Sequence, residues 1–205
     1  MEKIAIFGGT FNPIHNGHIH LCEECDAVFQ FDRILLMPTN IPPHKTAEDL
    51  ASNEDRLMMC RLACEDYPKI SVCDLEMRMQ GISYTVHTVK ELKKRYPTAK
   101  LYWIIGSDML FSFHKWYCYR EILEYVTLIA GARYPEEYER MAEYAEKVLK
   151  AGQKVRIIRS EVLTVSSTQI RSALEMGKQA EHLAPKVEAY IAEHGLYIQP
   201  EKRSE

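Results

Sequence analysis

The sequence lacks the features of a membrane or secreted protein. No apolar run approaches the roughly 18 residues that a membrane-spanning helix needs, and the start, Met1-Glu2-Lys3 before a short strand-like run, does not resemble a signal peptide. Positive charge is not in excess: 26 Lys and Arg face 29 Asp and Glu, a net charge of −3. Because free-standing nucleic-acid-binding domains are normally basic, we expect a cytoplasmic protein without a membrane or nucleic-acid partner.

Internal repeats, low-complexity tracts and long linkers are also lacking. The chain has 205 residues, 46% hydrophobic and 27% charged, which is the composition of a globular protein and excludes a disordered one. At about 150 residues per domain, the length corresponds to about 1.4 domains. We predict a single domain over residues 1–205, with C-terminal helices from about residue 167 packed on the same unit. No motif decides the oligomeric state, and a homo-oligomer stays open.

Six cysteines are present, four of them in two close pairs. Cys22 and Cys25 form a C-x-x-C motif and Cys60 and Cys64 a C-x3-C motif, so a zinc site or a redox pair has to be considered. Spacings of three and four place each pair on the apolar face of a helix, where cysteine commonly acts as a small buried hydrophobe. We interpret all four as core residues, and the sequence leaves open any role beyond packing.

Strand and helix patterns alternate along the chain. Short apolar runs between turn residues predict strands at 3–7, 33–37, 70–73, 101–105, 125–130 and 155–158. Helical periodicity and capping patterns predict helices at 17–29, 52–67, 83–96, 135–150, from about 167 and around 187–194, with short helical turns within 108–124. The alternation predicts an α/β fold: a Rossmann-like, doubly wound, mainly parallel sheet with helices on both faces and a small C-terminal helical part. In such a fold the ligand site lies at the carboxyl ends of the strands.

The loop after the first strand reads GGTFNPIHNGH and leads directly into a helix. Gly8 and Gly9 allow close backbone approach, the following helix N-terminus attracts anions, and Thr10 can donate through its hydroxyl. His15 and His18, three residues apart, can point into one pocket. The loop contains neither G-x-x-x-x-G-K nor G-x-G-x-x-G, but it favours a phosphate site. A zinc site is the alternative, with these ligands available: His15, His18, His20, Cys22 and Glu23.

Three further loops follow predicted strands at the same end of the sheet. In IPPHK two prolines stiffen the chain before Lys45, a candidate phosphate ligand. In IIGSDML, Gly106 ends a buried strand and Asp108 can accept from ribose hydroxyls or cap a helix. Trp116, a few residues on, can stack on a flat ring or anchor the core. The string SSTQIR opens a helix with a capping box, and its Ser167, Thr168 and Arg171 can also bind a triphosphate.

Together these strings resemble the nucleotidyltransferase superfamily that carries the H-x-G-H motif, and within it the bacterial nicotinate-nucleotide adenylyltransferases. The supporting strings are GGTFNPIHNGH, IPPHK, SYTVHTVKEL, IIGSDML, KWYCY, SSTQIR and EHGLY, which run from residue 6 to about 197. H-x-G-H alone would also fit pantetheine-phosphate adenylyltransferases and cytidylyltransferases, which are generally shorter and lack IPPHK and KWY at these places. The usual residue at position 12 is Asp, whereas this chain has Asn12.

The resemblance implies transfer of AMP from ATP to nicotinate mononucleotide in NAD biosynthesis, with release of pyrophosphate and with Mg²⁺ bound mainly through the ATP phosphates. We predict that His18 acts mainly on the α-phosphate and His15 on the β- or γ-phosphate, both as hydrogen-bond donors. Arg133 precedes Tyr134-Pro135 where the family often has R-P-G, so its position is the least certain to carry over. The implied site has three parts: catalytic His15, His18, Lys45 and Arg171; ATP-binding Gly8, Gly9, Thr10, Phe11, Gly106, Asp108, Ser167 and Thr168; and mononucleotide-binding Tyr84, Thr85, Trp116, Tyr117 and Arg133.

Three alternatives remain at the level of sequence. The acceptor can be nicotinamide mononucleotide, although the absence of an acidic residue from the SYT and KWY strings favours the nicotinate carboxylate. The chain can be a non-catalytic nucleotide sensor on the same fold, which the intact His15, His18 and Arg171 disfavour. It can also be a Cys/His zinc-binding interaction module. The lack of an obvious acid–base pair suits nucleotidyl transfer, because a phosphate monoester with a second pKa near ~6 is already an anionic nucleophile.

Overall fold

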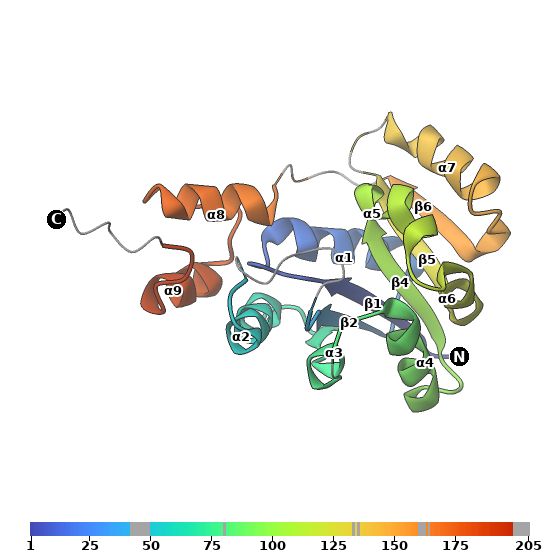
Figure 1. Ribbon diagram of the computed structural model, residues 1–205, viewed down its shortest axis with the longest axis horizontal. Coiled ribbons are helices and arrows are strands. Elements are labelled where there is room, and N and C mark those ends of the chain that lie inside the picture. The colour runs from blue at the N-terminus through green and yellow to red at the C-terminus, as the bar shows by residue number, and fades with distance from the viewer. Residues whose placement is uncertain are drawn as a thin grey trace.

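Strand β1 lies in the middle of a six-stranded parallel sheet (Figure 1). The computed structural model describes residues 1–41, 50–79, 81–132, 134, 136–159, 163 and 165–198. Within them the strand order is β3-β2-β1-β4-β5-β6, and all neighbouring pairs are parallel. The strands are β1 (Lys3–Gly9), β2 (Arg33–Pro38), β3 (Ile70–Val72), β4 (Lys100–Gly106), β5 (Val126–Ala132) and β6 (Val155–Arg159).

Helices cover both faces of this sheet (Figure 1). Successive strand residues point to opposite faces: along β1, Ala5 and Phe7 join one buried cluster, whereas Ile4 and Ile6 join the other. The first cluster packs against α1 (Asn16–Phe29), α2 (Asn53–Cys64), α8 (Ser167–Glu175) and α9 (Pro185–Glu193). The second packs against α3 (Leu75–Arg78), α4 (Thr85–Arg95), α5 (Ser107–Ser112), α6 (Tyr119–Tyr125) and α7 (Glu137–Lys147). The predicted fold class is confirmed.

The connections change direction beside β1. From β1 the chain runs through α1 to β2 and β3 on one side, and it then returns through α3 and α4 to β4 on the other side. The loops that follow β1 and β4 therefore leave the sheet toward opposite faces and open a crevice between them. This crevice is where a ligand is expected in an open parallel sheet.

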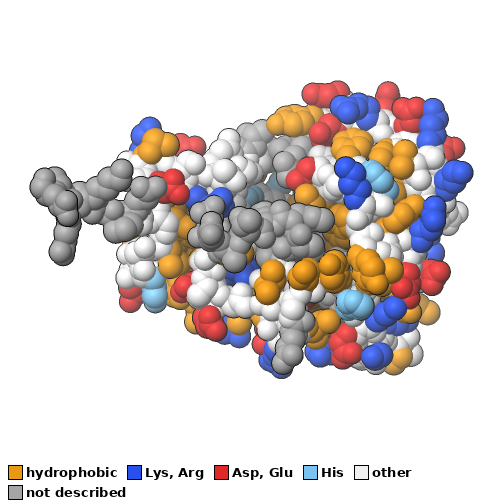
Figure 2. All heavy atoms as spheres, in the orientation of Figure 1, with side chains coloured by type: hydrophobic (Ala, Val, Ile, Leu, Met, Phe, Trp, Pro, Cys, Tyr) orange, Lys and Arg blue, Asp and Glu red, His pale blue; other side chains and the backbone are white. Residues whose placement is uncertain are grey.

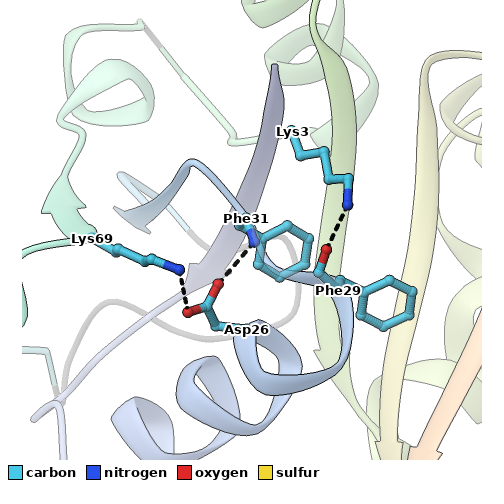
Figure 3. A network of polar contacts seen from close by, with 5 residues as sticks. All are labelled: Lys3, Asp26, Phe29, Phe31 and Lys69. Carbon is cyan, nitrogen blue, oxygen red and sulfur yellow. Dashed lines mark hydrogen bonds and ion pairs between the residues drawn. The ribbon is translucent and has the colours of Figure 1, made fainter. Parts of the chain in front are cut away.

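The C-terminal end of α1 is tied to β1 and to the chain just before β2 and just before β3 (Figure 3). Asp26 accepts hydrogen bonds from the backbone N–H of Phe31 and from Nζ of Lys69, both at 2.8 Å. Lys3 of β1 donates through Nζ to the carbonyl of Phe29, also at 2.8 Å. These contacts hold α1 against the sheet at the edge opposite the crevice, so that its first turn has a defined place.

The helices α8 and α9 pack on the first cluster. Ile170, Val187 and Ile191 are buried there. The hydroxyl of Tyr190 donates to Asp55 of α2 at 2.9 Å. None of the described helices combines the length and hydrophobicity that crossing a membrane requires.

Most expected elements lie within a few residues of their predicted bounds. The predicted capping residues are confirmed, since Ser52 accepts from the N–H of Asp55 and Ser166 from the N–H of Gln169. The short helix α3 was not predicted, because four residues are too few for a helical period. Helix α4 begins two residues later than expected, at Thr85, because the preceding chain is extended.

The paired cysteines are core residues, as interpreted from their spacing. All four lie buried in the first cluster: Cys22, Cys25, Cys60 and Cys64. Burial raises the pKa of each thiol, that of Cys64 to about 12, which disfavours the thiolate that zinc ligation needs. Among the residues with described positions, no three His, Cys, Asp or Glu side chains are grouped to hold a metal ion.

Candidate active site

A cavity of about 1040 Å³ opens at the carboxyl ends of the strands. Figure 2 shows this face of the molecule hollowed near its middle, with side chains of both charges interspersed on the α6 and α7 side. The cavity unites the glycine-rich loop after β1, the loop after β4 and the start of α8. It is lined by these predicted site residues: Gly8, Gly9, Thr10, Phe11, His15, His18, Tyr84, Thr85, Gly106, Asp108, Trp116, Tyr117, Ser167 and Thr168.

Several helices begin at this cavity. Residues in the first turns of α1, α4, α5 and α8 line it. The first turn of a helix has unpaired N–H groups and a partial positive charge. Because the first turns of α1 and α8 both line the cavity, we expect it to favour anions although the chain as a whole is acidic.

His15, the residue just before α1, stacks on His18 in the first turn of that helix. Their ring centroids are 3.6 Å apart with an interplanar angle of 24°. The backbone N–H of His15 donates to Nδ1 of His18 at 3.1 Å, so a neutral His18 ring carries its proton on Nε2. Phe11 meets the His18 ring edge-on at 5.0 Å. The His18 ring is thus fixed as a hydrogen-bond donor before any ligand binds.

Gly8 has no room for a side chain. A Cβ built there would lie 2.8 Å from Cζ2 of the buried Trp103, closer than carbon atoms pack. We expect Gly8→Ala to lower the free energy of unfolding by about 1–3 kcal/mol, as over-packed cores do, measured by urea denaturation. In a Gly8→Ala/Trp103→Leu double variant the smaller side chain relieves the clash, so its cost is expected to be less than the sum of the single costs. Additive costs would contradict this explanation.

Asn12 connects the glycine-rich loop to the rest of the molecule. Its Oδ1 accepts from the N–H of Ala51 at 3.0 Å and from the hydroxyl of Tyr197 at 2.7 Å. Its carbonyl accepts from Nη1 of Arg171 at 2.8 Å. Both side-chain contacts need only an acceptor oxygen, which an amide supplies as well as a carboxylate. The departure from the usual Asp therefore leaves the geometry of the loop intact.

The remaining predicted phosphate ligands differ in position. Ser167 donates to the carbonyl of Pro13 at 2.8 Å, which holds the start of α8 against the glycine-rich loop. Arg171 holds the Asn12 carbonyl and is not a lining residue of the cavity in this structure. Lys45 and Arg133 lie outside the described residues. The phosphate-binding roles of Arg171, Lys45 and Arg133 stay predictions.

An aromatic wall closes the other end of the cavity. The rings of Tyr84 and Tyr117 are 5.1 Å apart, and Trp116 packs at 5.1 Å against the buried Phe113. Trp116 lines the cavity and also packs against the second cluster, which confirms its role as a core anchor; its stacking on a flat ligand ring stays a prediction. Such a wall suits a flat ring.

Two further residues line the site and a third supports it, and the sequence did not identify any of them. Lys115 lines the cavity and directly precedes Trp116. Glu76 lines it as well and is 2% exposed. Arg56 is 1% exposed and donates from Nη1 to the Thr10 carbonyl at 2.8 Å. A signal existed for Arg56, since it shares the buried stripe of α2 at helical spacing with Met59, Cys60 and Ala63.

A cavity of this kind at the carboxyl ends of a doubly wound parallel sheet assigns the protein to the nucleotidyltransferases. The family model described as cytidylyltransferase-like matches residues 6–173, most of the chain. That match agrees with the loop after β1, the paired histidines and the start of α8, all of which fall within it.

Comparison with curated proteins defines the family within that class. The chain is 38% identical to a probable nicotinate-nucleotide adenylyltransferase of Synechococcus sp. strain JA-2-3B'a(2-13), with 97% of this chain and 98% of the relative covered. It is 37% identical to the nicotinate-nucleotide adenylyltransferase of Bacillus subtilis, with 96% and 99% covered. The chain belongs to the nicotinate-nucleotide adenylyltransferase family, and the resemblance found in the sequence is confirmed.

A solved structure agrees on the fold. The Plasmodium falciparum nicotinic acid mononucleotide adenylyltransferase, complexed with NaAD, superposes with a TM-score of 0.79 at 20% identity, covering 96% of this chain and 98% of the other. At this identity the likeness concerns the fold alone, which is the six-stranded parallel sheet described above.

Proposed function

We propose that this protein transfers AMP from ATP to nicotinate mononucleotide, forming nicotinate adenine dinucleotide and pyrophosphate. The observation that carries the proposal is the convergence of the α1 and α8 N-termini and the stacked His15–His18 pair on one large cavity. A triphosphate and a phosphate monoester are both polyanions, and this end of the cavity is built for anions. The opposite, aromatic end matches the pyridine ring.

The reaction needs positioning more than acid–base chemistry. An oxygen of the mononucleotide phosphate forms a bond to the α-phosphorus of ATP, and the bond from that phosphorus to the bridging oxygen of the β-phosphate breaks. The electron pair leaves with pyrophosphate. The nucleophile is already ionised near neutral pH, so the protein has to align the two phosphates and stabilise the charge that develops on the leaving oxygens.

His18 and His15 supply that stabilisation in our proposal. Nε2 of His18 is the donor end of a ring whose Nδ1 is occupied by the His15 backbone. A donor fixed in advance costs no reorganisation during the reaction. We assign His18 to the α-phosphate, and His15 to the β- or γ-phosphate.

The metal ion is proposed to arrive with ATP. Mg²⁺ commonly keeps several waters and binds through substrate phosphates and one or two carboxylates. The described part of the chain holds no cluster of three His, Cys, Asp or Glu that would form a complete metal site, and Asp108 lines the cavity. These residues fit an ion held mainly by the ATP phosphates. When bound, the ion neutralises charge on the triphosphate.

The remaining assignments follow the same proposal. Gly106 and Asp108 face the adenosine, and Tyr84, Thr85, Trp116 and Tyr117 face the nicotinate ring. The packing of α8 and α9 on the first cluster supports one catalytic unit over residues 1–205. The substrates are those of a cytoplasmic biosynthetic enzyme, and we place the protein there. A homo-oligomer is compatible with these assignments, and analytical ultracentrifugation measures the oligomeric state.

The first experiment compares the two mononucleotides as acceptors. With ATP and Mg²⁺, nicotinate mononucleotide is expected to release pyrophosphate with a kcat/KM at least ~10-fold above that of nicotinamide mononucleotide. Backbone N–H groups at the start of α4 favour a carboxylate over a neutral amide. A coupled assay for pyrophosphate measures both rates. Preference for the amide would make this a nicotinamide mononucleotide adenylyltransferase, and release from neither would favour a nucleotide sensor.

A further inference from the structure

Glu76 is an acidic side chain enclosed at the aromatic end of the cavity. It lies on α3 and is 2% exposed, yet it lines the same cavity as Tyr84 and Thr85. Carboxylates are rarely buried without a cation beside them. Nothing in the proposed transfer of AMP uses this group, so its burial calls for a separate explanation.

The contacts of Glu76 join it to the start of α4. Its Oε1 accepts from the hydroxyl of Thr88 at 2.7 Å. Ser83, whose hydroxyl lies beside the same carboxyl, and Thr88 flank Tyr84 and Thr85 on both sides. Oε2 is buried without a hydrogen-bond partner among the described residues. An enclosed carboxyl oxygen without a donor favours the protonated acid over the carboxylate.

The electrostatics agree with this geometry. Burial raises the pKa of Glu76 to about 7, although the Thr88 and Ser83 hydroxyls lower it. The group is therefore neutral below about pH 7 and ionised above it. Its ionisation state therefore changes close to neutral pH.

The charged groups on the elements around Glu76 have other partners. On its own helix Arg78 pairs with the neighbouring Asp74. On α4 Lys90 pairs with Glu121 of α6, and Glu91 with Lys94 and Arg95. The ring of His87 faces Tyr84 and Tyr117. Asp108 and Lys115 line the same cavity, and the β2 residues that pack nearby, Leu35 and Met37, are apolar.

We propose that Glu76 determines specificity by its protonation state: the neutral acid admits the ring carboxylate of nicotinate mononucleotide, and the ionised form repels it. This inference rests on the proposed function, which brings the nicotinate ring to Tyr84 and Thr85. The neutral acid can also donate a hydrogen bond from the oxygen that has no partner. An ionised Glu76 instead favours a neutral amide, whose N–H groups it can accept from.

The test is the pH dependence of acceptor preference. For each acceptor kcat/KM is measured from pH 6 to 8.5, and the nicotinate value is divided by the nicotinamide value. Titration of ATP and of the shared 5′-phosphate cancels in this ratio. In the wild-type enzyme the ratio is expected to fall about tenfold with an inflection near pH 7, the effect of one like charge nearby in a partly screened site.

Two variants separate charge from structure. Glu76→Gln keeps the shape and removes the titration, so its ratio is expected to be independent of pH. Thr88→Val removes the hydroxyl that stabilises the ionised form, so the inflection is expected at higher pH. Glu91→Gln is the matched control, because Glu91 is a surface residue of α4 paired with Lys94 and Arg95; its ratio should follow the wild type.

Four results would contradict the role proposed for Glu76 or the proposed function. If Glu76→Gln folds and its ratio still falls as in the wild type, Glu76 does not set the preference. If that variant does not fold, Thr88→Val decides, and an unmoved inflection overturns the proposal. Pyrophosphate release from both acceptors at a pH-independent ratio overturns this inference alone. Release from neither overturns the proposed function as well.

Discussion

Replacing His18 with Ala is expected to lower kcat about 100-fold or more. The reason is the loss of one preorganised donor to the α-phosphate, which typically costs this much in acyl and phosphoryl transfer. The ring is held by the His15 N–H, by stacking at 3.6 Å and by the edge of Phe11. A mobile side chain would lose part of this effect to reorganisation, whereas a fixed one contributes it in full.

Three variants measure this effect by steady-state pyrophosphate release. His18→Gln places an amide N–H near the position of Nε2 and should lose less activity than His18→Ala. His194→Ala is the control, since this exposed histidine stacks on Tyr190 at the end of α9 and does not line the cavity; its kcat should equal that of the wild type. A His18→Ala enzyme with near-normal turnover would remove His18 from the mechanism.

Replacing Arg56 with Met is expected to lower the free energy of unfolding by about 3 kcal/mol and to raise the KM for ATP. The buried guanidinium donates to the carbonyls of Thr10, Ala51 and Asn40, at 2.8, 3.3 and 3.2 Å, and to Oδ1 of Asn53. Each acceptor left without a donor costs about 1–3 kcal/mol. Removal of a buried charge offsets part of this sum, and burial already lowers the pKa of Arg56.

Urea denaturation and ATP saturation curves test the two parts. Arg61→Met changes the same side chain on the exposed face of the same helix, and its stability should stay within about 0.5 kcal/mol of the wild type. Arg56→Lys retains the charge but not the fork of donors, so an intermediate loss is expected. Wild-type stability of Arg56→Met would mean that water replaces the guanidinium at these carbonyls.

Some parts of the site could be recognised from the sequence, and others depended on the fold. The loop Gly8 to His18 is contiguous, so its glycines, its histidines and the helix that follows could all be recognised from the order of residues. The assembly of this loop with Ser167 could not be recognised, because His18 and Ser167 are 149 positions apart in the sequence and no local pattern connects them. Only the doubly wound class of the sheet predicted that both would lie at the same edge.

Glu76 is the residue for which the sequence was least informative about the charge around the site. The absence of acidic residues from the SYT and KWY strings was a sound argument for a nicotinate acceptor, but it counted only neighbours in sequence. The fold brings Glu76 to the same cavity, and burial there raises the pKa of its carboxyl group. Knowing that residue 76 is a glutamate therefore does not fix the charge at this place, because the protonation of a carboxyl group depends on its surroundings.

By itself the sequence determined the α/β class, the order of strands and helices along the chain, the core role of the cysteines and the family. Periodicity and contiguous motifs are local properties, so they can be recognised without the fold. Only the tertiary structure decided that the Asn12 side chain accepts two hydrogen bonds, that Arg56 donates to the carbonyl of Thr10 in the loop after β1, and that the first turns of several helices line one cavity. These features depend on contacts between distant segments. Direction, burial and distance arise only when the chain has folded.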